Sequence, residues 1–351
     1  MSSPYALLGC TALLAVSAIA TSTSRYPEAK IAQLKPYTYY ASAAYCAPEI
    51  TLAWSCGESC DANPSFKPIA SGGDGDDIQR WYVGYDNHLD TIIVAHQGLN
   101  MSNPKAFQTV LDFTPAELPR DVFPGLDRKG VVTHRGFAAA HSRATRDVMN
   151  AVEKGLSEHA TKKITAVGHS LGAALSLLDA VHIKLKMPDL KVEVVAYGMP
   201  RVGNTAFADY VDENIKITRV NNKDDPVPII PSTDFGYQHP SGELRIHDKG
   251  WISCDGQDNE NPLCSAGSIA SLFAGEIEDH MGPYDGLVIG CRPSLTSKPI
   301  VEPVVINEDT KPLESLNGTP RVENIVADPV ADKNTPASTI AVAPQVPKDE
   351  L

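Results

Sequence analysis

The chain has 351 residues, of which 42% are hydrophobic and 21% charged, a composition typical of a globular protein that buries a sizeable core. Its formal net charge of −13 argues against a nucleic-acid partner, because such a partner calls for a basic face. The same charge argues against docking to anionic lipid by electrostatic attraction alone. A neutral ester or lipid surface is compatible with it, since apolar contact needs no charge match.

The first residues have the features of a secretory signal peptide. An apolar stretch from Tyr5 to Ala20 precedes the polar run from Thr21 to Ser24, and residues 18–20 have the small-x-small form of a cleavage site. We therefore expect residues 1–20 to be a signal peptide. The stretch is shorter than the ~20 residues that a membrane span requires, so we expect no transmembrane anchor.

Between residues 24 and 292, apolar runs of β-type residues alternate with helical patterns. Short buried strands are expected at residues 91–95, 163–167, 192–197 and 216–220, and helices at residues 136–160 and 171–186. Such alternation predicts an α/β fold in which helices cover both faces of a largely parallel sheet. We expect residues 24–292 to form one domain.

The segment Gly168-His169-Ser170-Leu171-Gly172 fits the pattern G-x-S-x-G. A lone match is a weak signal, but here a predicted strand runs directly into the pattern and a predicted helix runs out of it. A nucleophile elbow requires this strand–turn–helix, with Gly168 and Gly172 leaving room around the turn. The context predicts that Ser170 presents a reactive hydroxyl. We expect His169 to pack within the elbow rather than to act in the chemistry.

A serine hydroxyl needs a base that takes its proton, and the base needs a carboxylate that orients it. In this type of fold the acid and then the histidine follow the serine along the chain. Asp224 and Asp225 come just after the strand predicted at residues 216–220, and acids at that place lie at the same sheet edge as the elbow. The spacing leaves three candidates for the base, which are His239, His247 and His280.

From about Pro293 the composition shifts to Pro, Val, Asp, Glu, Thr and Asn, without periodicity and without aromatic residues. Such a segment cannot bury enough apolar surface to offset its ordering entropy, so residues 293–351 are predicted to be a disordered tail. The last four residues, 348–351, are Lys-Asp-Glu-Leu, the retention signal of the endoplasmic reticulum. With the signal peptide, they predict a protein of the endoplasmic reticulum lumen that binds a retention receptor; secretion is the alternative.

Seven cysteines are present, and one of them, Cys10, lies in the predicted signal peptide. An even number remains, which in an oxidising compartment suggests three disulfides whose pairing the sequence leaves open. The six are Cys46, Cys56, Cys60, Cys254, Cys264 and Cys291. The spacing of Cys56 and Cys60 also suits metal ligands, but secreted cysteines normally pair with each other, so we expect no metal site.

Several segments together resemble the fungal class 3 lipases, a family that also includes feruloyl esterases. The matching segments are VAHQG (94–98), HRGF (134–137), GHSLG (168–172), GMPRVGN (198–204), DPVP (225–228), FGY (235–237), CDGQ (254–257) and HMGPYDG (280–286). They run in order through nearly the whole predicted domain and leave out the tail. The resemblance implies the α/β-hydrolase fold and a Ser–Asp–His triad.

The resemblance also implies which residues complete the triad. Family members place the acid directly before a Pro-Val-Pro-type run, which implies Asp225 and makes Asp224 a solvated neighbour. They place the histidine a few residues before a Tyr near the last cysteine, which implies His280. The disulfides that the resemblance implies are Cys46–Cys291, Cys56–Cys60 and Cys254–Cys264.

An oxyanion hole of two backbone N–H groups is implied as well. One group belongs to Leu171, directly after the nucleophile, and the other to Leu99, in the loop after an earlier strand. Family members usually carry Ser or Thr where this chain has Leu99, and that hydroxyl helps to hold the loop. A backbone donor survives the change to Leu, so the departure bears on efficiency and substrate range.

Asn103 and Pro104, followed by apolar positions 106, 107, 110 and 111, predict a short amphipathic helix after the oxyanion loop. Lipases of the family keep a mobile lid at this place, so we interpret the helix as a lid; a permanently packed surface helix is the alternative. Asn100, in the same loop, and Asn317, in the tail, each begin an N-x-S/T pattern and are glycosylation candidates.

These expectations combine into one function, a serine carboxylic ester hydrolase and, more closely, a triacylglycerol lipase that acts through an acyl-enzyme on Ser170. Its substrate is expected to be an ester or lipid at an interface, and no metal or organic cofactor is implied. Two alternatives stay open. One is a feruloyl or aryl carboxylesterase, and the other is a catalytically silent member of the fold that binds lipid or protein, which the departure at Leu99 supports.

Overall fold

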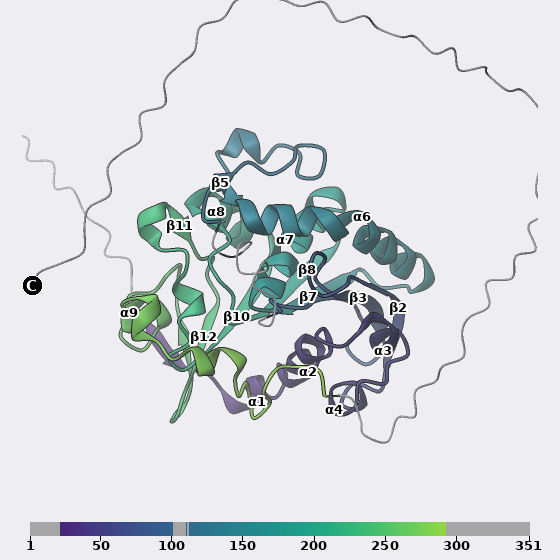
Figure 1. Ribbon diagram of the computed structural model, residues 1–351, viewed down its shortest axis with the longest axis horizontal. Coiled ribbons are helices and arrows are strands. Elements are labelled where there is room, and N and C mark those ends of the chain that lie inside the picture. Colours follow the sequence, from purple (N-terminus) through teal and green to yellow (C-terminus); the bar gives the residue numbers. More distant parts are fainter. Residues whose placement is uncertain (1–21, 101–109, 111, 293–351) are drawn as a thin grey trace, which may run out of the picture. The chain divides into compact units, whose positions relative to one another are not determined.

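The computed structural model describes residues 22–100, 110 and 112–292 (Figure 1). The expected signal peptide, the expected lid helix except Val110, Asn317, and the tail with its final tetrapeptide lie outside the described residues. Among the residues that are described, no helix is long and apolar enough to cross a membrane.

Nine strands form one mixed sheet, in the spatial order β1-β13-β12-β10-β8-β7-β4-β3-β2. Their bounds are β1 Thr23–Arg25, β2 Phe66–Gly72, β3 Trp81–Asp86, β4 Thr91–His96, β7 Lys163–His169, β8 Lys191–Tyr197, β10 Lys216–Asn222, β12 Glu243–His247 and β13 Gly250–Cys254. The five central strands, from β12 to β4, are parallel, whereas two strands at each edge are antiparallel. The four strands expected from the sequence are β4, β7, β8 and β10, all in the parallel part.

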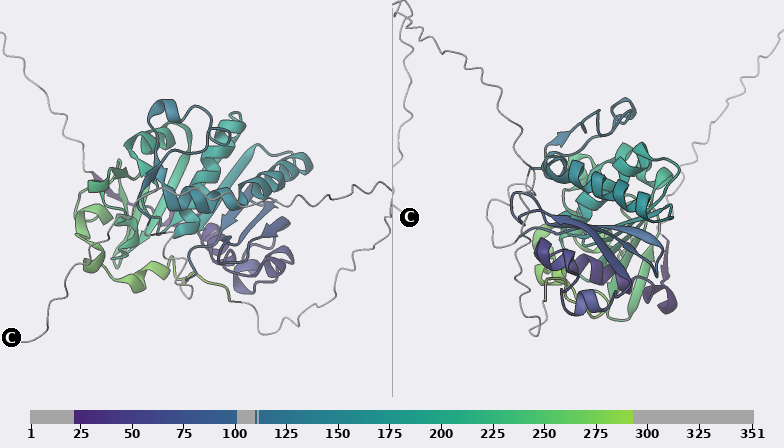
Figure 2. Two further views of the ribbon diagram at one scale, coloured as in Figure 1. Left: turned by 45° about the horizontal axis from the view of Figure 1, so that its top comes forward. Right: turned by 90° about the vertical axis from the view of Figure 1, so that its right-hand side faces the viewer.

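Helices cover both faces of this sheet, as Figure 2 shows. On one face lie α6 (Arg135–Glu158), α7 (Leu171–Lys186) and α8 (Thr205–Asn214), and on the other lie α2 (Lys35–Ala43), α3 (Pro48–Leu52) and α4 (Glu58–Asp61). Side chains alternate along β4, so that Ile92 and Val94 pack with α6 and α7 while Ile93 and Ala95 pack with α2. A strand buried on both faces has no polar side to present, which explains its uninterrupted apolar sequence.

A small second sheet lies beside the first, in the order β11-β9-β6-β5. Two helices begin at its residues. His134 Nδ1 accepts a hydrogen bond from the N–H of Phe137 at the start of α6, and Asn204 Oδ1 accepts one from Phe207 at the start of α8. The remaining elements are α1 Glu28–Ile31, β5 Pro115–Ala116, η1 Asp127–Lys129, β6 Thr133–His134, β9 Gly203–Asn204, η2 Val227–Ile229, η3 Thr233–Phe235, β11 Tyr237–Gln238, α9 Ser265–Ser268, η4 Leu272–Ala274 and η5 Ile277–Met281.

Three disulfides join the pairs that the family resemblance implies, namely Cys46–Cys291, Cys56–Cys60 and Cys254–Cys264. The first of them ties the chain just after α2 to the last described segment. Cys56 and Cys60 bond to each other, so their sulfurs are not available as metal ligands. In the described part of the chain, Glu243, Cys254 and Cys264 are the group of three potential ligands that lie close together, and there too both sulfurs belong to a disulfide.

Candidate active site

The chain turns sharply at Ser170, between the end of β7 and the start of α7. The backbone there has φ 59° and ψ −132°, a conformation that non-glycine residues rarely adopt and that stores strain. The N–H of Ser170 donates a 2.9 Å hydrogen bond to the carbonyl oxygen of Tyr197, which ties the turn to the end of β8. The serine therefore stands at the carboxyl edge of the parallel strands, where an elbow presents its hydroxyl.

Gly168 and Gly172 occupy positions where a side chain would not fit. A Cβ on Gly168 would lie 2.3 Å from the carbonyl oxygen of Gly172, and a Cβ on Gly172 would lie 2.3 Å from the carbonyl oxygen of His96. Both contacts are with backbone, which cannot move aside without displacing the elbow or the end of β4. The close approach of these segments thus depends on the two glycines.

Asp225 and His280 form a buried pair beside the elbow. Nδ1 of His280 lies 2.9 Å from Oδ2 and 3.1 Å from Oδ1 of Asp225. Asp225 comes just after β10, and its Oδ1 also accepts a 2.9 Å hydrogen bond from the N–H of Val227. Because a carboxylate accepts hydrogen bonds, the neutral imidazole carries its proton on Nδ1 and leaves Nε2 able to take a proton.

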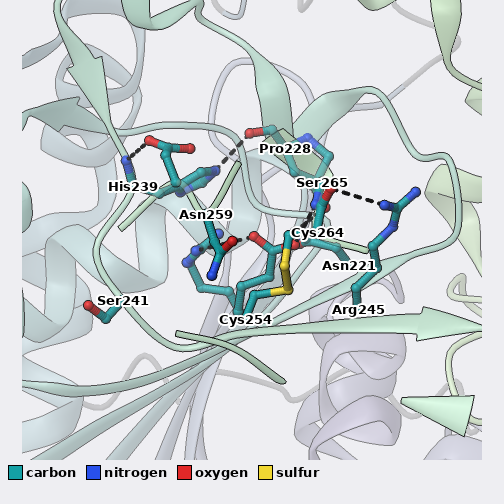
Figure 3. Close-up of polar contacts among 12 residues, drawn as sticks. Asn221, Pro228, His239, Ser241, Arg245, Cys254, Asn259, Cys264 and Ser265 are labelled. Carbon is teal, nitrogen blue, oxygen red and sulfur yellow. Dashed lines mark hydrogen bonds and ion pairs between the residues drawn. A yellow bond between two sulfur atoms is a disulfide. The ribbon is translucent and has the colours of Figure 1, made fainter. Parts of the chain in front are cut away.

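The two other candidate bases point elsewhere. Nε2 of His239 lies 2.7 Å from the carbonyl oxygen of Pro228, and Figure 3 shows the ring directed at that carbonyl. Nε2 of His247 lies 2.9 Å from the carbonyl oxygen of Leu263. Of these three histidines, His280 is the one that contacts the acid, so the geometry favours the residue that the resemblance implies.

Ser170 and His280 line one cavity of about 290 Å³. The rest of its lining is apolar and consists of Leu99, Val110, Leu171, Pro200, Pro226, Val227, Ile230, Leu272 and Ile277. An apolar acyl group can bury its surface against these side chains while its ester carbon approaches the serine. The cavity thus places one hydroxyl and one imidazole beside apolar side chains that can pack against a hydrocarbon chain.

The expected oxyanion residues, Leu99 and Leu171, both border this cavity. Leu171 is the first residue of α7, where backbone N–H groups have no partner within the helix. The loop that carries Leu99 lies directly against the elbow, because a Cβ on Gly98 would be 2.8 Å from the carbonyl oxygen of His169 and 3.1 Å from Cβ of Ser170. Such closeness favours the two N–H groups as donors to a developing oxyanion.

Tyr45 and His169, two residues outside the predicted catalytic set, form a chain of contacts that leads to the loop of His280. The ring nitrogens of His169 lie 2.7 Å from the hydroxyl of Tyr45 and 2.7 Å from the carbonyl oxygen of His280. The Tyr45 hydroxyl also lies at Gly98, where an added Cβ would approach it to 2.2 Å. Tyr45 has no motif of its own, and its position directly before Cys46 was the only signal that could have pointed to it.

Asp224 is exposed to solvent, as the family resemblance implies, and it also makes contacts that hold the neighbouring segments together. Its carboxylate is partly exposed and forms a 2.8 Å ion pair with Arg245 of β12. Its N–H donates to Oδ2 of Asp279 at 3.2 Å, and its carbonyl oxygen accepts from the N–H of Glu276 at 2.9 Å. Asp224 therefore connects the loop of the acid to β12 and to the segment that leads to His280.

A buried His–Asp–His cluster lies in the core near the elbow. Oδ2 of Asp179, on α7, is 2.5 Å from Nε2 of His96, and its Oδ1 is 2.8 Å from Nε2 of His141 on α6. All three side chains are buried. His96 ends β4, so the cluster connects the strand that leads to Leu99 with the helix that begins at Leu171.

Comparison with known proteins identifies the family. The sequence profile of the class 3 lipases matches residues 93–235, which include Ser170, Asp225 and both expected oxyanion residues. A secreted mono- and diacylglycerol lipase of Malassezia globosa is 34% identical over 225 residues, which are 63% of this chain and 72% of that protein. The chain belongs to the class 3 lipase family. As a class 3 lipase it is a serine ester hydrolase.

Solved structures of lipases share its fold. The crystal structure of the lipase from Rhizopus microsporus var. chinensis aligns with a TM-score of 0.64 and 28% identity, over 75% of this chain and 90% of that one. A triacylglycerol lipase whose catalytic centre is described as a serine protease triad aligns with a TM-score of 0.63 and 25% identity, over 74% and 96%. The expected α/β-hydrolase fold is confirmed.

Proposed function

We propose that this class 3 lipase hydrolyses acylglycerol esters, with Ser170 as nucleophile, His280 as base and then acid, and Asp225 as the orienting carboxylate. One observation carries the proposal. Ser170 and His280 line the same apolar cavity, and Nδ1 of His280 donates a hydrogen bond to the buried carboxylate of Asp225.

The chemistry follows from these positions. Ser170 attacks the ester carbon while Nε2 of His280 takes the hydroxyl proton, and the N–H groups of Leu99 and Leu171 stabilise the oxyanion. His280 then protonates the leaving alcohol, and an acyl-enzyme remains on Ser170. A water molecule, activated by the same imidazole, attacks the acyl-enzyme and releases the fatty acid.

The apolar lining supports an aliphatic acyl chain over a polar aryl ester. The Malassezia relative is named for mono- and diacylglycerols and one structural relative for triacylglycerols, so both substrate classes enter the test. We propose that triacylglycerols are the preferred substrates. The test compares the rates of hydrolysis of triacylglycerol, diacylglycerol, monoacylglycerol and methyl ferulate at equal ester concentration. Faster cleavage of methyl ferulate than of any acylglycerol would contradict this choice.

The nucleophile is tested with a soluble medium-chain p-nitrophenyl ester. Ser170→Ala lowers kcat by about 10⁴-fold or more, and a fluorophosphonate probe labels the unaltered protein but not the variant. Asp225→Asn lowers kcat by about 10³- to 10⁴-fold, because the imidazole loses the carboxylate that fixes its tautomer. Intact hydrolysis by correctly folded Ser170→Ala would refute the mechanism.

We also propose that the protein enters the secretory pathway and is retained in the endoplasmic reticulum through residues 348–351. The name of the Malassezia relative, a secreted lipase, supports the first step, and the terminal tetrapeptide supports the second. Removal of the tetrapeptide is then expected to send the protein into the medium. Unchanged localisation would contradict retention by this signal.

Of the two glycosylation candidates, we propose Asn317 rather than Asn100 as the acceptor. The side-chain nitrogen of Asn100, to which a glycan would attach, lies 2.8 Å from Oδ1 of Asp76 beside the active-site loop. Treatment with a glycosidase is expected to lower the apparent mass of the unaltered protein and of Asn100→Gln. The apparent mass of Asn317→Gln is expected to stay the same after the treatment.

A further inference from the structure

The buried His–Asp–His cluster spans the two elements that carry the expected oxyanion donors. His96 is the last residue of β4, where the strand still pairs with β3 and β7, and the loop to Leu99 begins directly after it. Asp179 lies on α7, the helix whose first residue is Leu171. The 2.5 Å contact between Oδ2 of Asp179 and Nε2 of His96 therefore joins the start of one donor's loop to the helix of the other donor.

The backbones of these two elements touch beside the cluster. A Cβ on Gly172, in the first turn of α7, would lie 2.3 Å from the carbonyl oxygen of His96 and 2.7 Å from that of Gln97. Because no space separates them, a small rotation of the end of β4 would displace the backbone of residues 97–99 relative to α7. An oxyanion donor acts within about 2.7–3.1 Å of the developing charge, so such a displacement weakens it.

The oxyanion loop is held on its other side by Gln97. The N–H of Gln97 donates to the carbonyl oxygen of Arg80 at 2.8 Å, and its Oε1 accepts from the N–H of Arg80 at 3.3 Å. These two hydrogen bonds fix the loop to the segment that leads into β3 and do not reach α7. Leu99 has no hydrogen-bonding group in its side chain that could do so. The contact of His96 with Asp179 supplies this hold on α7.

The chemistry of the cluster favours a role in orientation over a role in stability alone. All residues of α7 from Leu171 to Ile183 are buried, and most of them are apolar, so Asp179 is a polar group in an apolar core. Burial by itself would raise the pKa of Asp179, but the imidazoles of His96 and His141 hold that pKa below its usual value of 3.8. A buried charged contact is weak evidence for stability, because apolar side chains of similar volume often stabilise a core as well. Its directional hydrogen bond, in contrast, fixes the orientation of a ring.

We propose that Asp179 is a positioning residue of the oxyanion loop, which it holds through the imidazole of His96. The inference rests on the proposed function, because it concerns the donors that stabilise the oxyanion in that reaction. The second contact of Asp179, from its Oδ1 to Nε2 of His141 at 2.8 Å, leads to α6, which carries neither donor. The two histidines are therefore a matched pair. Both are buried and both contact the same carboxylate, but of the two it is His96 that precedes the loop.

The test compares a soluble p-nitrophenyl ester with the corresponding thionoester, in which sulfur replaces the carbonyl oxygen. Sulfur is a weak acceptor, so the ratio of kcat/KM for the ester to that for the thionoester measures how well the N–H donors are aligned. In the full-length protein, His96→Phe is expected to lower kcat for the ester by about 10- to 100-fold and this ratio by about tenfold, with KM within about twofold. His141→Phe is expected to keep kcat and the ratio within about twofold of the unaltered protein.

A conservative variant and a second apolar variant complete the set. His96→Gln is expected to restore the ratio to within about threefold, because its side-chain N–H can replace that of Nε2. Circular dichroism checks that each variant folds. The double variant His96→Phe/Asp179→Leu replaces His96→Phe if the latter does not fold, because it leaves no unpaired carboxylate in the core. The same low ratio is expected from it.

Three results would each overturn the proposal. They are an unchanged ratio in the folded apolar variant, an equal fall of the ratio in His141→Phe, and a ratio in His96→Gln as low as that in His96→Phe. A wrong catalytic assignment has a different signature, because it would show as hydrolysis of the ester by Ser170→Ala, whatever the two histidine variants do.

Discussion

The hydroxyl of Tyr45 and Nδ1 of His169 lie 2.7 Å apart, and Nε2 of the same imidazole lies 2.7 Å from the carbonyl oxygen of His280. A carbonyl oxygen accepts, so Nε2 of His169 donates to it and Nδ1 accepts from the Tyr45 hydroxyl. Burial holds the pKa of His169 well below its usual value of 6.5, so the ring stays neutral in this arrangement. Tyr45 and His169 together hold the backbone of His280, the proposed base.

This chain of hydrogen bonds predicts an effect of Tyr45→Phe on turnover. Loss of one neutral hydrogen bond that positions the base is expected to lower kcat by about two- to tenfold, with KM for a soluble ester within about twofold. The measurement is steady-state kinetics on a p-nitrophenyl ester. Tyr39→Phe is the matched control, because its hydroxyl donates a hydrogen bond to the exposed Glu58 at 3.3 Å, and it leaves kcat unchanged. An equal loss in both variants would contradict the positioning role.

A second prediction concerns stability in acid and depends on His134. Its Nδ1 accepts from the N–H of Phe137, its Nε2 donates to the carbonyl oxygen of Val110, and burial lowers its pKa from 6.5 to about 4. Between these two values the unfolded chain binds a proton that the folded chain does not. The contribution of His134 is therefore complete above pH 6.5 and is lost as the pH falls toward 4, by at most about 1.4 kcal/mol per pH unit.

The variant His134→Asn isolates this contribution, because asparagine also caps a helix but does not titrate. Urea unfolding of both proteins at pH 7.5 and pH 5 is expected to show a smaller loss of free energy of unfolding for the variant. His169 and His239 also have pKa values held well below 6.5 by burial, so both proteins lose some stability in acid. Identical losses in the two proteins would show that His134 titrates normally.

A third prediction concerns Asp179, whose carboxylate accepts from both His96 and His141. In Asp179→Asn one amide oxygen can accept from one imidazole, and the other buried ring loses its partner. We expect the free energy of unfolding to fall by about 1–3 kcal/mol, measured in urea. Asp147→Asn, at an exposed residue of α6, is expected to stay within about 0.5 kcal/mol of the unaltered protein. A smaller effect at Asp179 than at Asp147 would contradict this account.

The glycines of two helices give a fourth prediction. In Gly172→Ala the new methyl group would lie 2.3 Å from the carbonyl oxygen of His96, in the backbone that leads to the oxyanion loop. We expect kcat to fall by about 10²-fold or more, comparable to the loss of an oxyanion donor. In Gly155→Ala the nearest atoms are the side-chain ends of Ile69 and Ile92 at 2.9 Å, which can rotate away, so activity is retained. Equal activities would show that the approach of β4 to α7 is not critical.

The parts of the fold that the sequence predicted are those with a strong local signal. β4, β7, β8 and β10 are continuous apolar runs, and α7 follows the elbow pattern directly, so periodicity locates them. The strands β1, β2, β3, β12 and β13 were not predicted. β1, β2 and β13 have few buried residues, and β3 and β12, although mostly buried, mix apolar residues with glycine or charged residues and so show no continuous apolar run. Four of the five parallel strands were therefore expected, whereas β12 and the antiparallel edges were not.

The active site shows the same division between local and distant information. The elbow around Ser170 is contiguous in sequence and was located from its pattern. His280 and Asp225 are 55 residues apart, and spacing alone left three histidines open until the family resemblance selected one. Tyr45 is 124 residues from His169, and their contact depends on how α2 packs under the sheet, which no local pattern records.

The backbone at Ser170 has a consequence for how this protein balances durability against reactivity. A residue without a side chain would adopt φ 59° at little cost, so Ser170→Gly should give a fold that resists denaturant better than the natural one. The natural chain is less stable by this amount because it carries a serine hydroxyl at this position. The proposed nucleophile thus lies at one of the strained backbone positions of the described chain, and substitutions chosen for stability alone would remove its hydroxyl.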